Sequence, residues 1–196
     1  MVSSPAPRVP DLHKSAFWIY GVTAMVMREP LSIVLHHAVT AGWADPTVVR
    51  EGLRTLIVLL LMSKQFLASG IYFDRVYIQP ESAERFPRRS YPTDFLFGMA
   101  ALLVAVGAST VIGSPPPMFD RVAGAMLLSN AVWIAVSKVA SYSTVARIAP
   151  AAISDIVTLA VFAASLLVFG EAAGYVVLLL LLLGQIAHLI RNYAAV

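Results

Sequence analysis

Three charged residues interrupt the first two apolar segments of the chain. Arg28 and Glu29, followed by Pro30, lie near the middle of the stretch 16–40, and Lys64 lies near the middle of 53–73. An ionised group at the centre of a bilayer costs on the order of 3 kcal/mol by insertion scales. We therefore expect Glu29 to bridge Arg28 and Lys64, or one cation to remain for an anion. Without transport, the same contact would be an ionic staple between two helices.

Pro30 and His36 extend the interpretation of this stretch. A proline inside a helix removes one backbone hydrogen bond, and broken helices at the midplane expose backbone groups to ions in many transporters. His36 returns to the direction of Glu29 and Thr40 continues that face, whereas His37 points about 100° away. Because histidine titrates near neutral pH, the stripe predicts a path for a proton or cation, with His36 as the outer relay.

A second polar layer is predicted near one surface of the protein. Lys138, Asp155 and His188 lie close to the ends of the fourth, fifth and sixth apolar segments, and antiparallel packing of the last two would place Asp155 opposite His188. Long side chains at that depth reach water, so a salt-bridge cluster is the favoured interpretation. Deeper in these segments, Asn130 and Gln185 are predicted to be hydrogen-bond partners between helices.

Composition places these residues in a membrane protein. Of the 196 residues 59% are hydrophobic and 13% are charged, whereas an average soluble domain carries about 25% charged residues; the mean hydropathy is +0.78. Six stretches have the length that crosses about 30 Å of hydrocarbon, namely 16–40, 53–73, 94–113, 121–141, 150–169 and 172–191.

The predicted fold is an all-α, polytopic bundle of six transmembrane helices. It occupies 16–192, after a disordered cytoplasmic N-terminus at 1–15. The alternative is five helices plus a re-entrant segment, because the two halves of 16–40 on either side of Pro30 are each too short to span a bilayer.

Lysine and arginine are unevenly divided between two sets of loops. The N-terminus, the second and fourth loops and the C-terminus hold nine (Arg8, Lys14, Arg75, Arg85, Arg88, Arg89, Lys138, Arg147 and Arg191), and the other loops hold three (Arg50, Arg54 and Arg121). The positive-inside rule therefore puts both termini in the cytoplasm. Arginine outnumbers lysine eleven to three, a bias typical of GC-rich bacterial genomes, so the predicted location is a bacterial inner membrane.

The largest polar segment is the loop 74–93, on the predicted cytoplasmic side. Arg85, Arg88 and Arg89 lie there beside Phe86 and Tyr91. Such a cluster suits contact with anionic lipid headgroups, although arginines in this place also set topology by themselves. If the chain is a scaffold, this loop is where we expect a partner to bind.

Several classes of function are disfavoured. The chain has no cysteine, which excludes disulfides and thiolate metal sites. The net charge of +3 is spread between hydrophobic runs, so nucleic acid is not an expected partner. The histidines are too far apart for one metal ion or a haem, and no cofactor is predicted. Common local enzyme motifs are absent, which argues against an enzyme.

These residues predict a channel or transporter for a small ion, a proton or a small solute. Glu29 would be the exchanging carboxylate, with Arg28 and Lys64 tuning it. Because six helices form a narrow bundle, a path between two or more identical subunits is expected. Two alternatives stay open: a non-transporting membrane subunit or scaffold that anchors a partner, and, ranked last, a lipid-modifying membrane enzyme that holds a headgroup phosphate with the 85–89 cluster.

Overall fold

The computed structural model describes residues 10–73, 91–139 and 145–194. Every element in these ranges is an α-helix, so the predicted all-α class is confirmed for them. The helices are α1 (Pro10–Ala41), α2 (Pro46–Phe73), α4 (Tyr91–Thr110), α5 (Pro116–Val139), α6 (Val145–Phe169) and α7 (Glu171–Ala194). Each overlaps one predicted apolar segment and begins before it, because a helix continues through polar residues where its apolar run stops.

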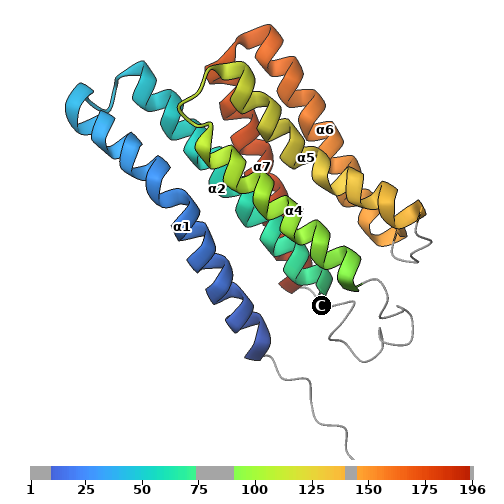
Figure 1. Ribbon diagram of the computed structural model, residues 1–196. Coiled ribbons are helices and arrows are strands. Elements are labelled where there is room, and N and C mark those ends of the chain that lie inside the picture. The colour runs from blue at the N-terminus through green and yellow to red at the C-terminus, as the bar shows by residue number, and fades with distance from the viewer. Residues whose placement is uncertain (1–9, 74–90, 140–144, 195–196) are drawn as a thin grey trace, which may run out of the picture.

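The helices lie side by side and alternate in direction (Figure 1). Three short connections, 42–45, 111–115 and Gly170, gather at one end of the bundle, which we call the turn end. The first turn of α1 and the last turn of α7 lie at the opposite end. α2 is central and packs against α1, α4, α5 and α7, whereas α1 lies at the edge against α2 and α4.

Asp45 and Gly42 shape the connection between α1 and α2. Gly42 has a φ of 93° and donates its N–H to the carbonyl of Ala38, which is how a helix commonly ends. Asp45 caps α2, because its Oδ1 accepts the N–H of Thr47 at 2.8 Å, with Pro46 in the first helical position. This backbone hydrogen bond lowers the pKa of the Asp45 carboxyl.

α1 is one continuous helix that includes Pro30. The five-span alternative required the chain to turn back near this proline, so the re-entrant segment is not what the chain forms. Pro30 itself is buried, so the missing hydrogen bond faces the rest of the bundle.

The core draws side chains from all six helices. Its members include Met27 of α1, Ile57 of α2, Ala108 of α4, Phe119 of α5, Phe162 of α6 and Leu178 of α7. A second, small cluster of Val34, Ala38 and Val48 holds the half of α1 nearer the turn end against α2. The main core therefore surrounds α2, and α1 is attached to it with fewer apolar contacts.

The outer surface of the bundle is apolar on every helix. Large side chains are exposed from α1 to α7, among them Met25, Leu56, Leu103, Val132, Leu167 and Leu180. Two helices are long and apolar enough to cross a membrane in the described part of the chain, over Ala152–Phe169 and Glu171–Arg191. Only 28% and 22% of these windows are buried, so most of each window lies on the surface of the bundle.

Gly174 allows α6 and α7 to approach closely, and its replacement gives a test of this packing. A Cβ at Gly174 would lie 2.6 Å from Cδ2 of Leu166 and 3.3 Å from its Cα, whereas a Cβ at Gly184 on the same helix meets nothing within 4 Å. We expect Gly174→Ala to destabilise the protein by about 1–3 kcal/mol through overpacking. Gly184→Ala should leave stability equal or raise it by up to about 1 kcal/mol.

Thermal unfolding of both variants in detergent, followed by circular dichroism, measures the difference. Equal unfolding temperatures for the two variants would show that α6 and α7 are not packed as closely as described.

Candidate functional site

Arg54 of α2 is completely buried, with 0% of its surface exposed. Its Nη1 donates to two backbone carbonyls, Ile112 O at 2.8 Å and Ser114 O at 2.7 Å. Its Nε donates to the hydroxyl of Tyr175 in α7 at 3.1 Å, and that hydroxyl donates to Oδ1 of Asp120 in α5 at 3.0 Å. This one side chain therefore joins α2 to α5, α7 and the end of α4.

The surroundings of Arg54 suit a cation. Its guanidinium carbon lies 5.0 Å from the ring centroid of Phe119 and 5.3 Å from that of Tyr175, within the range of cation–π attraction. The carbonyls of Ile112 and Ser114 lie in the connection 111–115, just after α4, and as backbone acceptors both accept from Arg54. Oε2 of Glu171 lies 3.9 Å from Nη2. Asp120 and Glu171 thus place two carboxylates around one buried guanidinium.

Counting Arg54 among the loop charges is wrong, because it lies inside α2, about two turns after Pro46. The periodicity of the apolar residues in α2 is the signal that could have revealed the buried position of Arg54. Arg54 shares a helical face with Val58 and Leu61, which are 0% and 4% exposed, so the charge continues an apolar stripe. Removing Arg54 from the loop count strengthens the asymmetry of the loops and leaves the predicted orientation unchanged.

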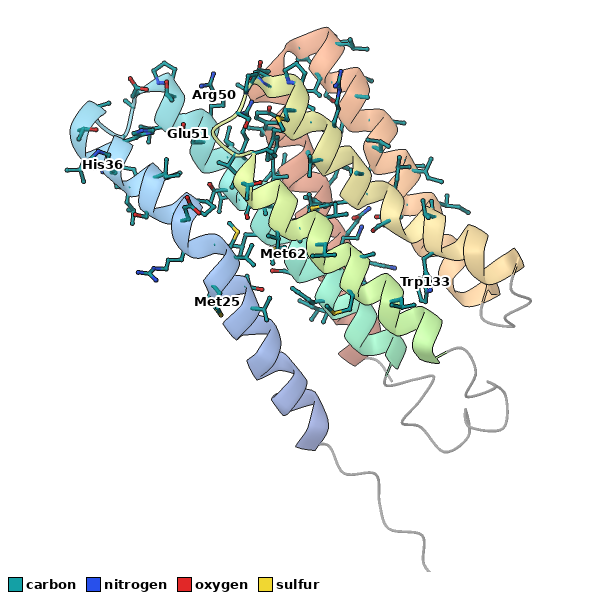
Figure 2. All side chains as sticks on the ribbon, in the orientation of Figure 1. Met25, His36, Arg50, Glu51, Met62 and Trp133 are labelled. Atoms are coloured by element: carbon teal, nitrogen blue, oxygen red, sulfur yellow. The ribbon has the colours of Figure 1, made fainter. Side chains whose placement is uncertain are left out.

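Lys64 of α2 and Asp155 of α6 form a buried ion pair. The Lys64 ammonium donates to Oδ1 of Asp155, and the residues are 7% and 0% exposed. Lys64 lies nine residues before the end of α2 and Asp155 ten residues after the start of α6, so both are about 15 Å from the helix ends opposite the turn end. Figure 2 labels Met62, two residues before Lys64, midway along α2.

A small recess adjoins the Lys64 side chain. Its volume is about 10 Å³, room for about one water molecule, and it is lined by Leu61, Lys64, Gln65, Val104, Met126 and Ser129. Gln65 and Ser129 bring polar groups from α2 and α5 to this point. Lys64 therefore pairs with a carboxylate of α6 and shares a recess with two neutral polar residues, Gln65 of α2 itself and Ser129 of α5.

Neutral polar groups also accompany Asp155 along α6. Gln185 of α7 donates from Nε2 to Oγ of Ser154 and to Oγ1 of Thr158, each at 2.8 Å. Gln185 therefore does bond between helices, but to α6 instead of to the predicted Asn130, whose side chain lies outside the described part. Thr158 is buried one turn beyond Asp155.

The predicted bridge from Glu29 to Lys64 is wrong. Arg28 and Glu29 are both exposed on α1, whereas Lys64 pairs with Asp155. Asp155 in turn lies deeper than the predicted polar layer near the surface, because α6 begins at Val145 and not at the first residue of its apolar run.

The register between α1 and α2 explains the error. His37 Nδ1 lies 2.8 Å from Oε2 of Glu51 near the turn end, and Figure 2 shows Glu51 on the part of α2 that faces α1. From this contact Glu29 is eight residues along α1, whereas Lys64 is thirteen residues along α2. Their depths therefore differ by about 8 Å, although both lie near the midpoint of an apolar segment.

The stripe of Glu29, His36 and Thr40 lies on the outside of the bundle. All three residues are exposed, and the Thr40 hydroxyl donates to the carbonyl of His36 at 2.9 Å. The stripe therefore lines no interior path within one chain. It is His37, predicted to have no share in the site, that reaches a carboxylate on α2.

Other predicted residues are placed only in part. His188 is exposed near the end of α7. The side chain of Lys138 and the residues Arg85, Arg88 and Arg89 lie outside the described residues, so the inner polar layer and the headgroup contact stay predictions.

The arrangement favours proton or cation binding as its chemistry. Among the described residues no group of three or more histidine and carboxylate side chains could hold a metal ion. Arg54, Lys64 and Asp155 instead form two centres along α2, the Arg54 network and the Lys64–Asp155 pair, ten residues or about 15 Å apart. Buried Glu51 contacts His37 near the turn end.

Replacement of Arg54 tests whether its network holds the helices together. Arg54→Met leaves two carbonyls and the Tyr175 oxygen without their donor and removes the cation beside Asp120 and Glu171, so we expect a loss of about 3–5 kcal/mol in stability. Tyr175→Phe, which removes one hydroxyl, should cost about 1–2 kcal/mol. Arg50→Met is the matched control, because Arg50 is exposed one turn earlier. If Arg54→Met unfolds at the same temperature as Arg50→Met, the network does not organise the bundle.

Comparisons of the chain with models of protein families, with curated proteins and with solved structures found no match.

Proposed function

We propose that the chain is an integral membrane protein of six transmembrane helices that carries protons or another small cation by exchange at Asp155. The observation that carries this proposal is the Lys64–Asp155 ion pair, buried midway along a bundle whose outer surface is apolar. The exchanging carboxylate is thus on α6 instead of at Glu29, and Lys64 keeps its role as the cation that tunes it.

The apolar surface supports a location in the bilayer. Lipid tails are the surroundings in which exposed leucine, valine and methionine side chains carry no cost in free energy, and all six helices present such side chains. The three short connections at the turn end would then lie on one side of the membrane. By the positive-inside rule, the asymmetry of lysine and arginine supports an orientation with that side outside and both termini in the cytoplasm.

Energetics favour a functional over a purely structural ion pair. Transfer of two ions from water to a protein interior costs several kcal/mol per ion, and well-packed apolar residues of similar volume often stabilise a protein as well or better. Ionisable residues inside membrane helices accordingly mark ion and proton pathways. If the carboxylate of Asp155 binds Lys64 and a transported cation in turn, the buried charges have a function. Packing alone does not require charges at these two positions.

The exchange follows from competition for one carboxylate. With Asp155 ionised, the Lys64 ammonium occupies it. A proton or small cation that binds Asp155 displaces Lys64, which then meets the neutral oxygens of Gln65 and Ser129 in the adjoining recess. Because Asp155 is fully buried, its occupant enters and leaves only when the helices around it move, which separates the two sides of the membrane.

Flux through liposomes tests this function. Purified protein is reconstituted, and internal pH and membrane current are followed under imposed proton, sodium and potassium gradients. We expect wild-type flux and at least a tenfold loss in Asp155→Asn, on the order expected when an essential ionisable group is removed. Lys64→Met should still show flux, and it should do so at a lower cation concentration than the wild type needs, because no ammonium competes for Asp155.

Two further variants keep the result interpretable. Asp155→Asn leaves the buried ammonium of Lys64 without its carboxylate. The double variant Lys64→Met with Asp155→Asn removes both ionised groups and should fold as well as the wild type, yet carry no flux. Ser165→Ala on α6 is the matched control, because the Ser165 hydroxyl bonds to the carbonyl of Val161 in its own helix. Absence of wild-type flux under every gradient, or full flux in the double variant, would contradict the proposal and favour the scaffold.

A further inference from the structure

α1 presents an outward face that combines apolar and charged side chains. Met25 is 80% exposed and Val39 is 81% exposed, and Ser32 between them is exposed as well. These three residues repeat at intervals of seven, the spacing that keeps one seam of a helix directed at a parallel neighbour. Arg28 and Glu29 are exposed on the same side of α1.

The two charges flank this seam on opposite sides. Successive side chains of an α-helix are turned by 100° about its axis. The outward direction of α1 is the one opposite to the mean direction of its buried residues, which are Met27, Pro30, Val34 and Ala38. Arg28 then lies about 65° to one side of that direction and Glu29 about 35° to the other. Met25 and Val39, with Ser32 between them, form the seam, and one charge of each sign lies at its edges.

A second copy of the chain complements this pattern. In a dimer with a twofold axis along the membrane normal, each residue to one side of the seam meets the residue to the other side in the partner. Arg28 of each copy therefore faces Glu29 of the other, at a difference in height of about 1.5 Å. Lipid tails leave both charges unpaired, whereas a second copy pairs them twice.

We propose that α1 is the interface of a parallel homodimer in the membrane, with Met25, Ser32 and Val39 in its seam and two Arg28–Glu29 pairs at its edges. The inference rests on the membrane location of the proposed function, but not on ion transport. His36, about 15° from the outward direction, lies close to the seam, so the stripe on the outside of one chain becomes enclosed between two.

Charge reversal tests the pairing. Two differently tagged copies are expressed together and purified through one tag, and recovery of the other reports the dimer. Arg28→Glu alone places carboxylates opposite carboxylates, and Glu29→Arg alone places guanidinium groups opposite each other, so each variant should recover its own copy at least about tenfold less than the wild type. A copy with Arg28→Glu should recover a copy with Glu29→Arg as well as wild type recovers itself.

The absence of cysteine in the chain gives a second measurement. Ser32→Cys and Met25→Cys should form a disulfide between two copies in oxidised membranes, and Leu167→Cys, which is 88% exposed on α6, should not. Equal cross-linking at all three positions, cross-linking of Ser32→Cys to a different protein, or indifference of recovery to both charge reversals overturns the dimer.

If the reconstituted protein shows no flux but Ser32→Cys still forms the disulfide between two copies, only the proposed ion exchange is contradicted. Intact flux from chains that do not cross-link at Ser32→Cys would count against the dimer only.

Discussion

The bundle depends on one constraint: the two cations that α2 carries into the interior must be given partners by other helices. Arg54 and Lys64 are 0% and 7% exposed, and Glu51, the carboxylate of α2 one turn before Arg54, contacts His37 of α1 instead. Arg54 takes its partners from α5, α7 and the end of α4, and Lys64 takes Asp155 from α6. Because an unpaired buried charge is far more costly than a paired one, these contacts fix how the other helices are arranged around α2.

The same constraint divides the interior into layers. Between the two cations, α2 contributes Ile57, Val58, Leu61 and Met62, all with 4% or less of their surface exposed. An ion released at Asp155 would have to cross this apolar layer, about 15 Å long, to reach the carboxylates around Arg54. A static bundle closes that route, so transport through it requires rearrangement of α2 relative to α6. The small recess beside Lys64 lies next to the place where such a rearrangement would begin.

Sequence was sufficient for the class of fold and the position of each helix, because apolar runs and turn residues are local signals. It was not sufficient for the pairing of charges. Lys64 and Glu29 lie at the midpoints of neighbouring apolar segments, yet their relative depth is set by the connection 42–45 and by His37 on Glu51. The partner of Lys64, Asp155, is ninety-one residues away. Contacts over such separations depend on how the helices pack against one another. The periodicity within one helix carries no information about that packing.

The interior pairing has a consequence for the edge of the bundle. Since Lys64 is neutralised by Asp155 of α6, the charges of α1 have no function inside, and α1 is joined to α2 mainly by the His37–Glu51 contact and the cluster of Val34, Ala38 and Val48. Arg28 and Glu29 are therefore left at the surface of α1, among exposed apolar residues such as Met25 and Val39. On a water-soluble protein, water would solvate two such surface charges, and they would need no partners. In the proposed bilayer they would require partners as much as Lys64 does, and a second copy of the chain would supply them, so the proposed location and the proposed dimer rest on the same physical rule.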